Sequence, residues 1–172
     1  EAELALDETG RFLAMRVKSL VSLGAYLYAD RQHQPAWSNL GGLAGTYTTP
    51  AIHVSVTGVL TNTSTTATYR GAGRPEASYM IERMIDIAAR QTGRDRVELR
   101  RKNTIPAEAM PYQTGLTFQY DSGDFRRNLE DALKLAEGFH SEMPIQKARQ
   151  HVEFVVDMAT KQMPMDHRDG RY

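Results

Sequence analysis

The most constraining stretch of the sequence is residues 68–77, TYRGAGRPEA, where a β-rich run meets an amphipathic helix. Gly71 and Gly73 stand at this junction. Pro75 follows at a place that suits the first turn of a helix, because its missing N–H would have no partner there. Backbone N–H groups at a strand–turn–helix junction point toward an anion. If the chain has a chemical site, we expect it here.

An ordinary strand–turn–helix connection is the competing interpretation of this segment. In that case the glycines only permit a tight backbone, and Arg70 and Arg74 are surface charges. The Gly-Ala-Gly run also resembles the start of a dinucleotide-binding fingerprint, but Glu76 stands where the third glycine belongs, and the preceding segment has an antiparallel pattern. The pattern alone therefore leaves both a binding site and a plain turn open.

Composition narrows the classes of function. The 21 basic and 21 acidic side chains cancel, which gives no electrostatic case for nucleic acid or an anionic membrane as partner. No apolar run approaches the roughly 18–20 residues of a membrane span. Cysteine is absent, which excludes disulfides, thiolate metal sites and cysteine nucleophiles. We expect a cytoplasmic chain with no metal ligands of its own, no nucleic-acid partner and no membrane partner.

Two segments near the N-terminus have strand patterns. Residues 12–20 and 52–61 alternate apolar and polar positions. Residues 21–28 favour a bent continuation of the first strand, with a short helix as the alternative. Turn residues at positions 7–11 predict a hairpin whose first strand lies upstream of Glu1. Residues 30–50 read as a long loop. The residues expected to face inward are Leu13, Met15, Val17, Ile52, Val54 and Val56.

Helices dominate the remainder of the predicted fold. One opens at Pro75, buries an apolar face and stops at Gly93. A short helix follows, with Asp95 as its cap and Glu98 at the capping-box position. The basic residues 100–102 near its end are expected to be solvated and matched to the helix dipole. The apolar face of the first helix comprises Met80, Ile81, Met84, Ile85 and Ala88.

The last third of the chain has weaker signals. We expect a short strand at residues 117–120, a helix that opens after residues 121–124 and ends at Gly138, and a final helix over residues 142–162. The predicted fold class is therefore α+β, with a small mixed or antiparallel sheet followed by helices.

Several spaced motifs resemble the xanthine dehydrogenase and aldehyde oxidase family. Residues 67–77 look like the loop beside molybdenum in its molybdopterin-binding large subunit, most similar to the carbon monoxide dehydrogenase type. Residues 45–52, 99–103 and 120–125 are similar to further family motifs. The resemblance predicts a partial molybdopterin-binding domain over residues 1–138, followed by a divergent C-terminal helix and tail at residues 139–172.

The resemblance implies a molybdenum hydroxylase that oxidises aldehydes or heterocycles with water as oxygen donor. Its cofactor would be molybdopterin cytosine dinucleotide with molybdenum, and its electrons would leave through iron–sulfur and flavin subunits. By resemblance, Arg70, Gly71 and Gly73 bind the cofactor and Ala72 lines the substrate pocket. The family's pterin loops and catalytic glutamate match no part of these residues, so no catalytic residue is assigned.

Two departures from the family pattern narrow the expected chemistry. Copper-containing carbon monoxide oxidisers carry a cysteine directly after the loop arginine, and here that position is Gly71. We therefore expect no molybdenum–copper centre. Ala72 is too small to stack on a purine, which disfavours purine substrates.

We expect a fragment of the catalytic subunit, inactive alone, whose partners are the remaining parts of that subunit and the iron–sulfur and flavin subunits. The alternative is a non-enzymatic structural or assembly module on the same scaffold. Exposed apolar surface along the first strands would favour the fragment, because severed contacts leave such patches. The same surface could support self-association.

Overall fold

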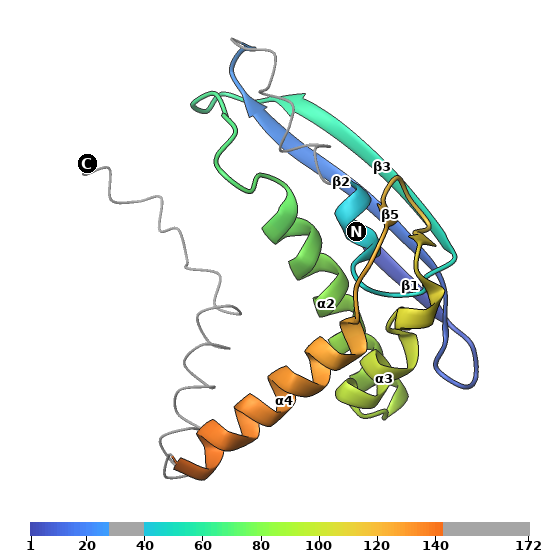
Figure 1. The fold of residues 1–172 in the computed structure, drawn as a ribbon. Helices are drawn as coiled ribbons and strands as arrows, with labels where there is room; N and C mark the ends of the chain where they lie inside the picture. The colour runs from blue at the N-terminus through green and yellow to red at the C-terminus, as the bar shows by residue number, and fades with distance from the viewer. Residues whose placement is uncertain (28–39, 143–172) are drawn as a thin grey trace. The chain divides into compact units, whose positions relative to one another are not determined.

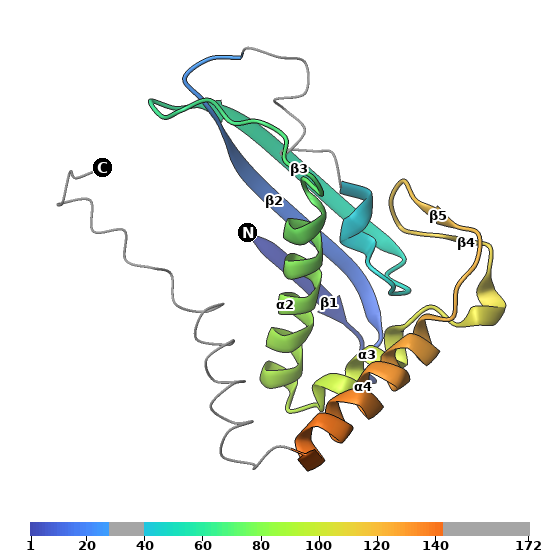
Figure 2. The same ribbon diagram turned by 60° about the vertical axis from the view of Figure 1, so that its left-hand side comes forward.

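The computed structural model describes residues 1–27 and 40–142. Its contacts divide the chain into one compact unit at Glu1–Arg127 and a second at Asn128–Tyr172. Within the first unit, a three-stranded sheet lies beside helix α2 (Arg74–Thr92), as Figures 1 and 2 show. The predicted α+β class with a small mixed sheet is confirmed.

The sheet has the order β1-β2-β3, formed by Ala2–Leu6, Phe12–Gly24 and Ala51–Leu60. β1 and β2 are antiparallel, and the turn between them is held by Asp7, whose Oδ1 accepts the N–H of Arg11 at 2.8 Å. The predicted hairpin is confirmed, but its first strand is β1 itself and not a segment upstream of Glu1.

β2 and β3 are parallel along their whole pairing, from Ala14 beside Ala51 to Gly24 beside Leu60. The antiparallel pattern expected for the segment before the glycine turn is therefore wrong. A parallel pair needs a crossover of a dozen residues or more, and the long connection between Gly24 and Ala51 supplies that length. Its described part contains the 3-10 helix η1 (Leu40–Ala44).

The core lies between one face of this sheet and α2. Met15 and Val17 are buried as expected, and Ile52, Val54 and Val56 are half-buried on the same face. Leu13 is 48% exposed, however, and Phe12 is buried in its place. The pairing register shifts beside the turn, where Leu6 pairs with Phe12 and Ala5 with Ala14. This bulge removes Leu13 from the inward face.

Helix boundaries agree closely with the capping signals. α2 begins at Arg74, one residue before the expected Pro75, and stops at Gly93, which has φ 67°. The short helix α3 (Arg96–Asn103) is capped by Asp95, which accepts the N–H groups of Val97 and Glu98 at 2.8 and 2.9 Å. The side chain of Glu98 pairs with Arg101.

The remaining elements are η2 (Ala107–Ala109), the hairpin β4 (Tyr112–Gln113) with β5 (Gln119–Tyr120), and α4 (Phe125–Glu142). The strand expected at residues 117–120 is confirmed only over its second half, as β5. α4 continues through Gly138, so the predicted end there is wrong; a glycine in a helix interior costs only about 1 kcal/mol relative to alanine. The helix expected over residues 142–162 lies outside the described residues.

None of the helices in residues 1–27 and 40–142 is both long and apolar enough to cross a bilayer.

Candidate functional site

Two overlapping tight turns lie immediately before α2. The N–H of Ala72 donates to the carbonyl of Tyr69, and the N–H of Arg74 donates to that of Gly71, both at 2.9 Å. Gly71 and Gly73 have φ values of 87° and 81° and occupy the third position of each turn. That position needs a positive φ in a type II turn, which costs other residues roughly 1–2 kcal/mol.

The approach to these turns differs from the expectation. β3 ends at Leu60, and residues 61–69 have no strand assignment. They return past the end of β2, where the N–H of Thr66 donates to the carbonyl of Leu23 at 3.3 Å. The prediction of a strand that runs into the glycine turn is therefore wrong. β2 ends at Gly24, so no further residues of β2 are available to pair with residues 61–69 as a strand. The turn–helix half of the prediction is confirmed.

Unpaired backbone donors distinguish this turn from a plain connection. Within residues 1–27 and 40–142, the N–H groups of Gly71 and Gly73 have no hydrogen-bond partner. Gly73 is buried and Gly71 is half-buried, and a Cβ built on Gly71 would meet no atom within 4 Å. Buried N–H groups are rarely left unpaired. Two of them beside a helix N-terminus suit a negatively charged oxygen.

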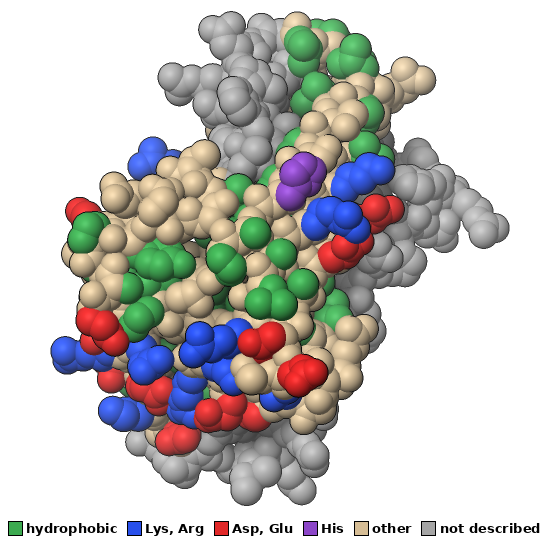
Figure 3. All heavy atoms as spheres, turned by 90° about the vertical axis from the view of Figure 1, so that its right-hand side faces the viewer, with side chains coloured by type: hydrophobic (Ala, Val, Ile, Leu, Met, Phe, Trp, Pro, Cys, Tyr) green, Lys and Arg blue, Asp and Glu red, His purple; other side chains and the backbone are tan. Residues whose placement is uncertain are grey.

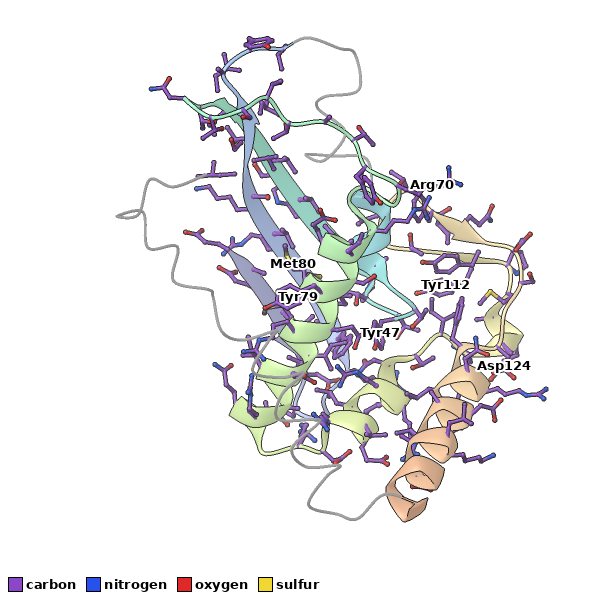
Figure 4. All side chains as sticks on the ribbon, turned by 90° about the vertical axis from the view of Figure 1, so that its left-hand side faces the viewer. Tyr47, Arg70, Tyr79, Met80, Tyr112 and Asp124 are labelled. Carbon is purple, nitrogen blue, oxygen red and sulfur yellow. The ribbon has the colours of Figure 1, made fainter. Side chains whose placement is uncertain are left out.

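The side chains of the turn lie at the surface. Figure 4 shows Arg70 directed away from α2, and its guanidinium forms no hydrogen bond or ion pair with the described residues. Ala72 is half-buried. Tyr69 is 86% exposed. The sequence pattern did not predict this exposure. The turn thus places a cation, an aromatic ring and two N–H donors within a few residues, and the cation and both donors have no partner among the described residues.

A partly buried polar cluster connects α2 to α3. The hydroxyl of Tyr47 donates to Glu82 Oε1 at 2.7 Å, and Arg100 Nε donates to Glu82 Oε2 at 2.7 Å. Arg100 Nη2 also donates to Asp86 Oδ1 at 3.0 Å. The pKa of Tyr47 is raised well above its usual range. Burial is the larger cause, and the hydrogen bond to Glu82 is the second.

The sequence predicted that Arg100 would be solvated, and this prediction is wrong. The side chain of Arg100 is only 15% exposed. Glu82 and Asp86 are four residues apart on α2 and so lie on one helix face, where both accept from the guanidinium. Those hydrogen bonds raise the pKa of Arg100 although burial acts against it. The missed signal was an arginine in a helix facing acidic residues of another helix.

Asn103 connects α3 to the β1–β2 turn. Its Oδ1 accepts the N–H of Phe12 at 2.8 Å, and its Nδ2 donates to the carbonyls of Gly10 at 2.9 Å and Leu99 at 2.8 Å. The residue is 1% exposed. The motif at residues 99–103 thus has an architectural role in this structure.

The motif at residues 120–125 is also architectural. The hydroxyl of Tyr120 donates to the carbonyl of Gly45 at 2.8 Å, and its ring meets Phe125 edge-on at a centroid distance of 5.4 Å. Burial raises the pKa of Tyr120. Asp124, labelled in Figure 4 at the start of α4, accepts the N–H of Arg127 at 3.0 Å. This bond links the motif to the first turn of α4.

No group of three or more histidine, aspartate or glutamate side chains among the described residues could hold a metal ion. The donors at the glycine turn are backbone N–H groups and arginine guanidinium groups, among them that of Arg70. Such a set can hold an anionic group but does not ligate a metal directly.

Comparison with known proteins supports the resemblance. The model of the molybdopterin cofactor-binding domain matches residues 1–104. The chain is 36% identical over 141 residues to the 6-hydroxypseudooxynicotine dehydrogenase complex subunit gamma of Paenarthrobacter nicotinovorans, covering 78% of this chain and 17% of that protein. It is 39% identical over 140 residues to the carbon monoxide dehydrogenase large chain of Hydrogenophaga pseudoflava, with 77% and 17% covered.

The fold is also found in a solved structure, the reconstituted CO dehydrogenase from Oligotropha carboxidovorans. The TM-score is 0.72 at 36% identity, and the match covers 90% of this chain and 19% of that one. The chain thus spans about a sixth of the length of the curated relatives it matches. From the family match over residues 1–104, the chain belongs to the molybdopterin cofactor-binding domain family.

Proposed function

We propose that this chain is a fragment of the catalytic, molybdopterin-binding subunit of a molybdenum hydroxylase, and that its glycine turn forms one wall of the cofactor site. The observation that carries the proposal is the pair of N–H groups at Gly71 and Gly73, next to the start of α2, which have no partner in the part of the chain that the structure describes. When bound, the molybdenum cofactor supplies the oxidation of an aldehyde or heterocycle with water as oxygen donor.

The residues of the turn have distinct roles in this proposal. The N–H groups of Gly71 and Gly73 are held by the two turns, so they stabilise anionic oxygens without reorganising. The guanidinium of Arg70 adds a positive charge beside them. Ala72 lines the substrate side, where its small side chain leaves space for a ring but no surface on which a purine could stack.

The proposed cofactor form is molybdopterin cytosine dinucleotide, and the proposed partners are iron–sulfur and flavin subunits. The relatives' names support a multi-subunit enzyme, since one is a large chain and another is subunit gamma of a complex. Gly71 stands where copper-containing carbon monoxide oxidisers carry a cysteine, which favours an organic substrate over carbon monoxide.

Exposed apolar side chains at the far end of the sheet favour the fragment over the alternative of a self-sufficient assembly module. Leu20 of β2 is 71% exposed and Leu60 of β3 is 62% exposed. A module that functions alone would be expected to cover such residues, whereas a segment of a larger subunit leaves them to its neighbours.

The proposal is tested by Gly71→Ala in the complete holoenzyme that contains this segment. An alanine there forces a side chain into a left-handed backbone and places a methyl group beside the free N–H donors. We expect the molybdenum and pterin content per enzyme to fall by about tenfold, the equivalent of about 1.4 kcal/mol. Gly93→Ala is the matched control, since Gly93 also has positive φ and open space, and lies at the other end of α2.

Equal molybdenum content in the two variants would refute the proposed role of the turn. The same metal analysis measures copper. We expect none in the loaded enzyme, and stoichiometric copper would overturn the assignment to organic substrates.

A further inference from the structure

A hollow of about 700 Å³ lies beside α3, and all of its lining residues belong to the first unit. It is bounded by the β1–β2 turn, the residues between α2 and α3, α3 itself and the first turn of α4. Its volume falls in the range of sites that bind small molecules. Figure 3 shows most charged side chains of the face in view gathered in its lower part, the height at which Figure 1 places α3 and the β1–β2 turn.

Cations outnumber acids among the residues that line this hollow. The cations are Arg94, Arg101, Lys102 and Arg126, and the acids are Asp95 and Glu98. The lining therefore carries two positive charges in excess. Both acids already have partners, because Asp95 accepts two N–H groups as the cap of α3 and Glu98 pairs with Arg101.

The other three cations of the hollow donate only to backbone carbonyls. Arg94 donates to the carbonyl of Glu8 and Lys102 donates to that of Thr9, whereas Arg126 Nη2 donates to a carbonyl of α3 at 3.4 Å. In the part of the chain that the structure describes, none of the three forms an ion pair with a carboxylate. A carbonyl carries no net charge, so it does not neutralise the cation that it binds.

Asp7 of the β1–β2 turn does not pair with these cations either. The main cause of its lowered pKa is the hydrogen bond from the N–H of Arg11, and the charge of Lys102 is the smallest cause. Its Oδ1 accepts from residues of its own turn. A guanidinium has five N–H donors and an ammonium three, so each cation of the hollow keeps donors beyond the one that its carbonyl accepts.

We propose that Arg94, Lys102 and Arg126 bind a phosphate monoester in this hollow. A phosphate monoester carries close to two negative charges at neutral pH, which matches the two positive charges in excess in the lining. Guanidinium and ammonium groups both recognise phosphate oxygens. Their bonds to the turn and to α3 hold these side chains in place beforehand, so less side-chain freedom is lost when the ligand binds.

The hollow is a different site from the glycine turn. The turn precedes α2, whereas Arg94 follows it, and the 19 residues of this helix span roughly 28 Å at 1.5 Å per residue. A ligand in the hollow therefore does not occupy the proposed wall of the cofactor site.

Phenyl phosphate is the probe for this site, added to the whole chain at constant ionic strength. We expect saturable binding by calorimetric titration, both in this chain and in the complete molybdopterin-binding subunit that contains it. Phenyl sulfate has the same shape but only one negative charge, so it should bind at least about tenfold more weakly.

Two variants test the assigned cations. Arg126→Gln should weaken the binding of phenyl phosphate by about tenfold and leave the fold intact, because the guanidinium donates only to one distant carbonyl among the described residues. Lys102→Gln should weaken binding similarly, and circular dichroism checks that the chain stays folded without the contact to Thr9. Arg90→Gln is the matched control, since it removes the same charge from an exposed residue of α2 that does not line the hollow.

Three results would overturn the proposal. The first is no saturable binding of phenyl phosphate. The second is equal affinity for phenyl sulfate or an equal effect of Arg90→Gln, either of which would show only an adventitious attraction of anions. The third is loss of binding in the complete subunit, which would show that another segment fills the hollow. Because the test reads only binding at this site, its failure leaves the proposed function of the glycine turn unaffected.

Discussion

At the scale of single residues, buried polar groups determine how the family-like motifs act. Tyr47 and Arg100 both meet the carboxylate of Glu82, so one acidic residue of α2 connects two distant segments. A buried donor that loses its acceptor costs more than the bond itself contributes. Such a cluster therefore stabilises one arrangement of α2 relative to its neighbours.

Tyr47→Phe tests this cluster. We expect a loss of about 1–2 kcal/mol in unfolding free energy at neutral pH, because Glu82 loses one donor. The pKa of Tyr47 is raised on folding, so its contribution is complete below the usual tyrosine pKa of about 10 and is lost as pH rises toward the folded value. Urea denaturation at pH 7 and pH 10.5 should show the wild type approaching the variant.

Tyr79→Phe is the control for this experiment, since Tyr79 is an exposed tyrosine of the same helix. It should change the unfolding free energy little at either pH. An equal effect of the two substitutions would contradict a special role for Tyr47.

At the scale of elements, α3 is short and mainly charged, yet it organises the first unit. Only Leu99 and Asn103 of this helix are buried. Asn103 contacts the β1–β2 turn directly, and the N–H of Thr48 donates to its carbonyl at 2.8 Å. An eight-residue helix is marginal alone, so these contacts and the Asp95 cap stabilise it.

Asn103→Ala is predicted to destabilise the first unit by about 2–4 kcal/mol, because the buried N–H of Phe12 and the carbonyl of Gly10 both lose their partner. The midpoint of urea unfolding measures this loss. Asn62→Ala, at an exposed position after β3, should cost far less. Similar midpoints for the two variants would show that the Asn103 contacts contribute little.

At the scale of the whole molecule, the glycine turn supplies only one wall of the proposed site. The relatives of the chain are about five times longer. In the proposed site, other parts of a larger subunit would enclose most of the cofactor, and exposed apolar side chains lie at the far end of the sheet. Both features favour a segment that acts as part of a larger assembly.

We therefore expect the purified chain to be catalytically inert. It should contain no molybdenum by elemental analysis and should not reduce a redox dye in the presence of an aldehyde, because the residues of the turn enclose only one side of the cofactor. A complete molybdenum hydroxylase assayed in parallel is the positive control. Aldehyde-dependent turnover by the isolated chain would refute the fragment interpretation.

The sequence by itself determined the features that depend on a few neighbouring residues. Gly93 marks the end of α2, Asp95 caps α3, and Asp7 holds the hairpin turn. The motifs around the glycine turn also indicated the family, which the match over residues 1–104 confirms. These signals are local because caps, turns and hydrophobic periods act over only a few residues along the chain.

Only the tertiary structure decided the features that depend on contacts between distant segments. The parallel pairing of β2 with β3, the outward turn of Leu13 and the burial of Arg100 between two helices all differ from the expectation. Strand direction depends on the path of the intervening chain, and the environment of a charge depends on which carboxylates fold against it. Neither can be determined from residues adjacent in sequence.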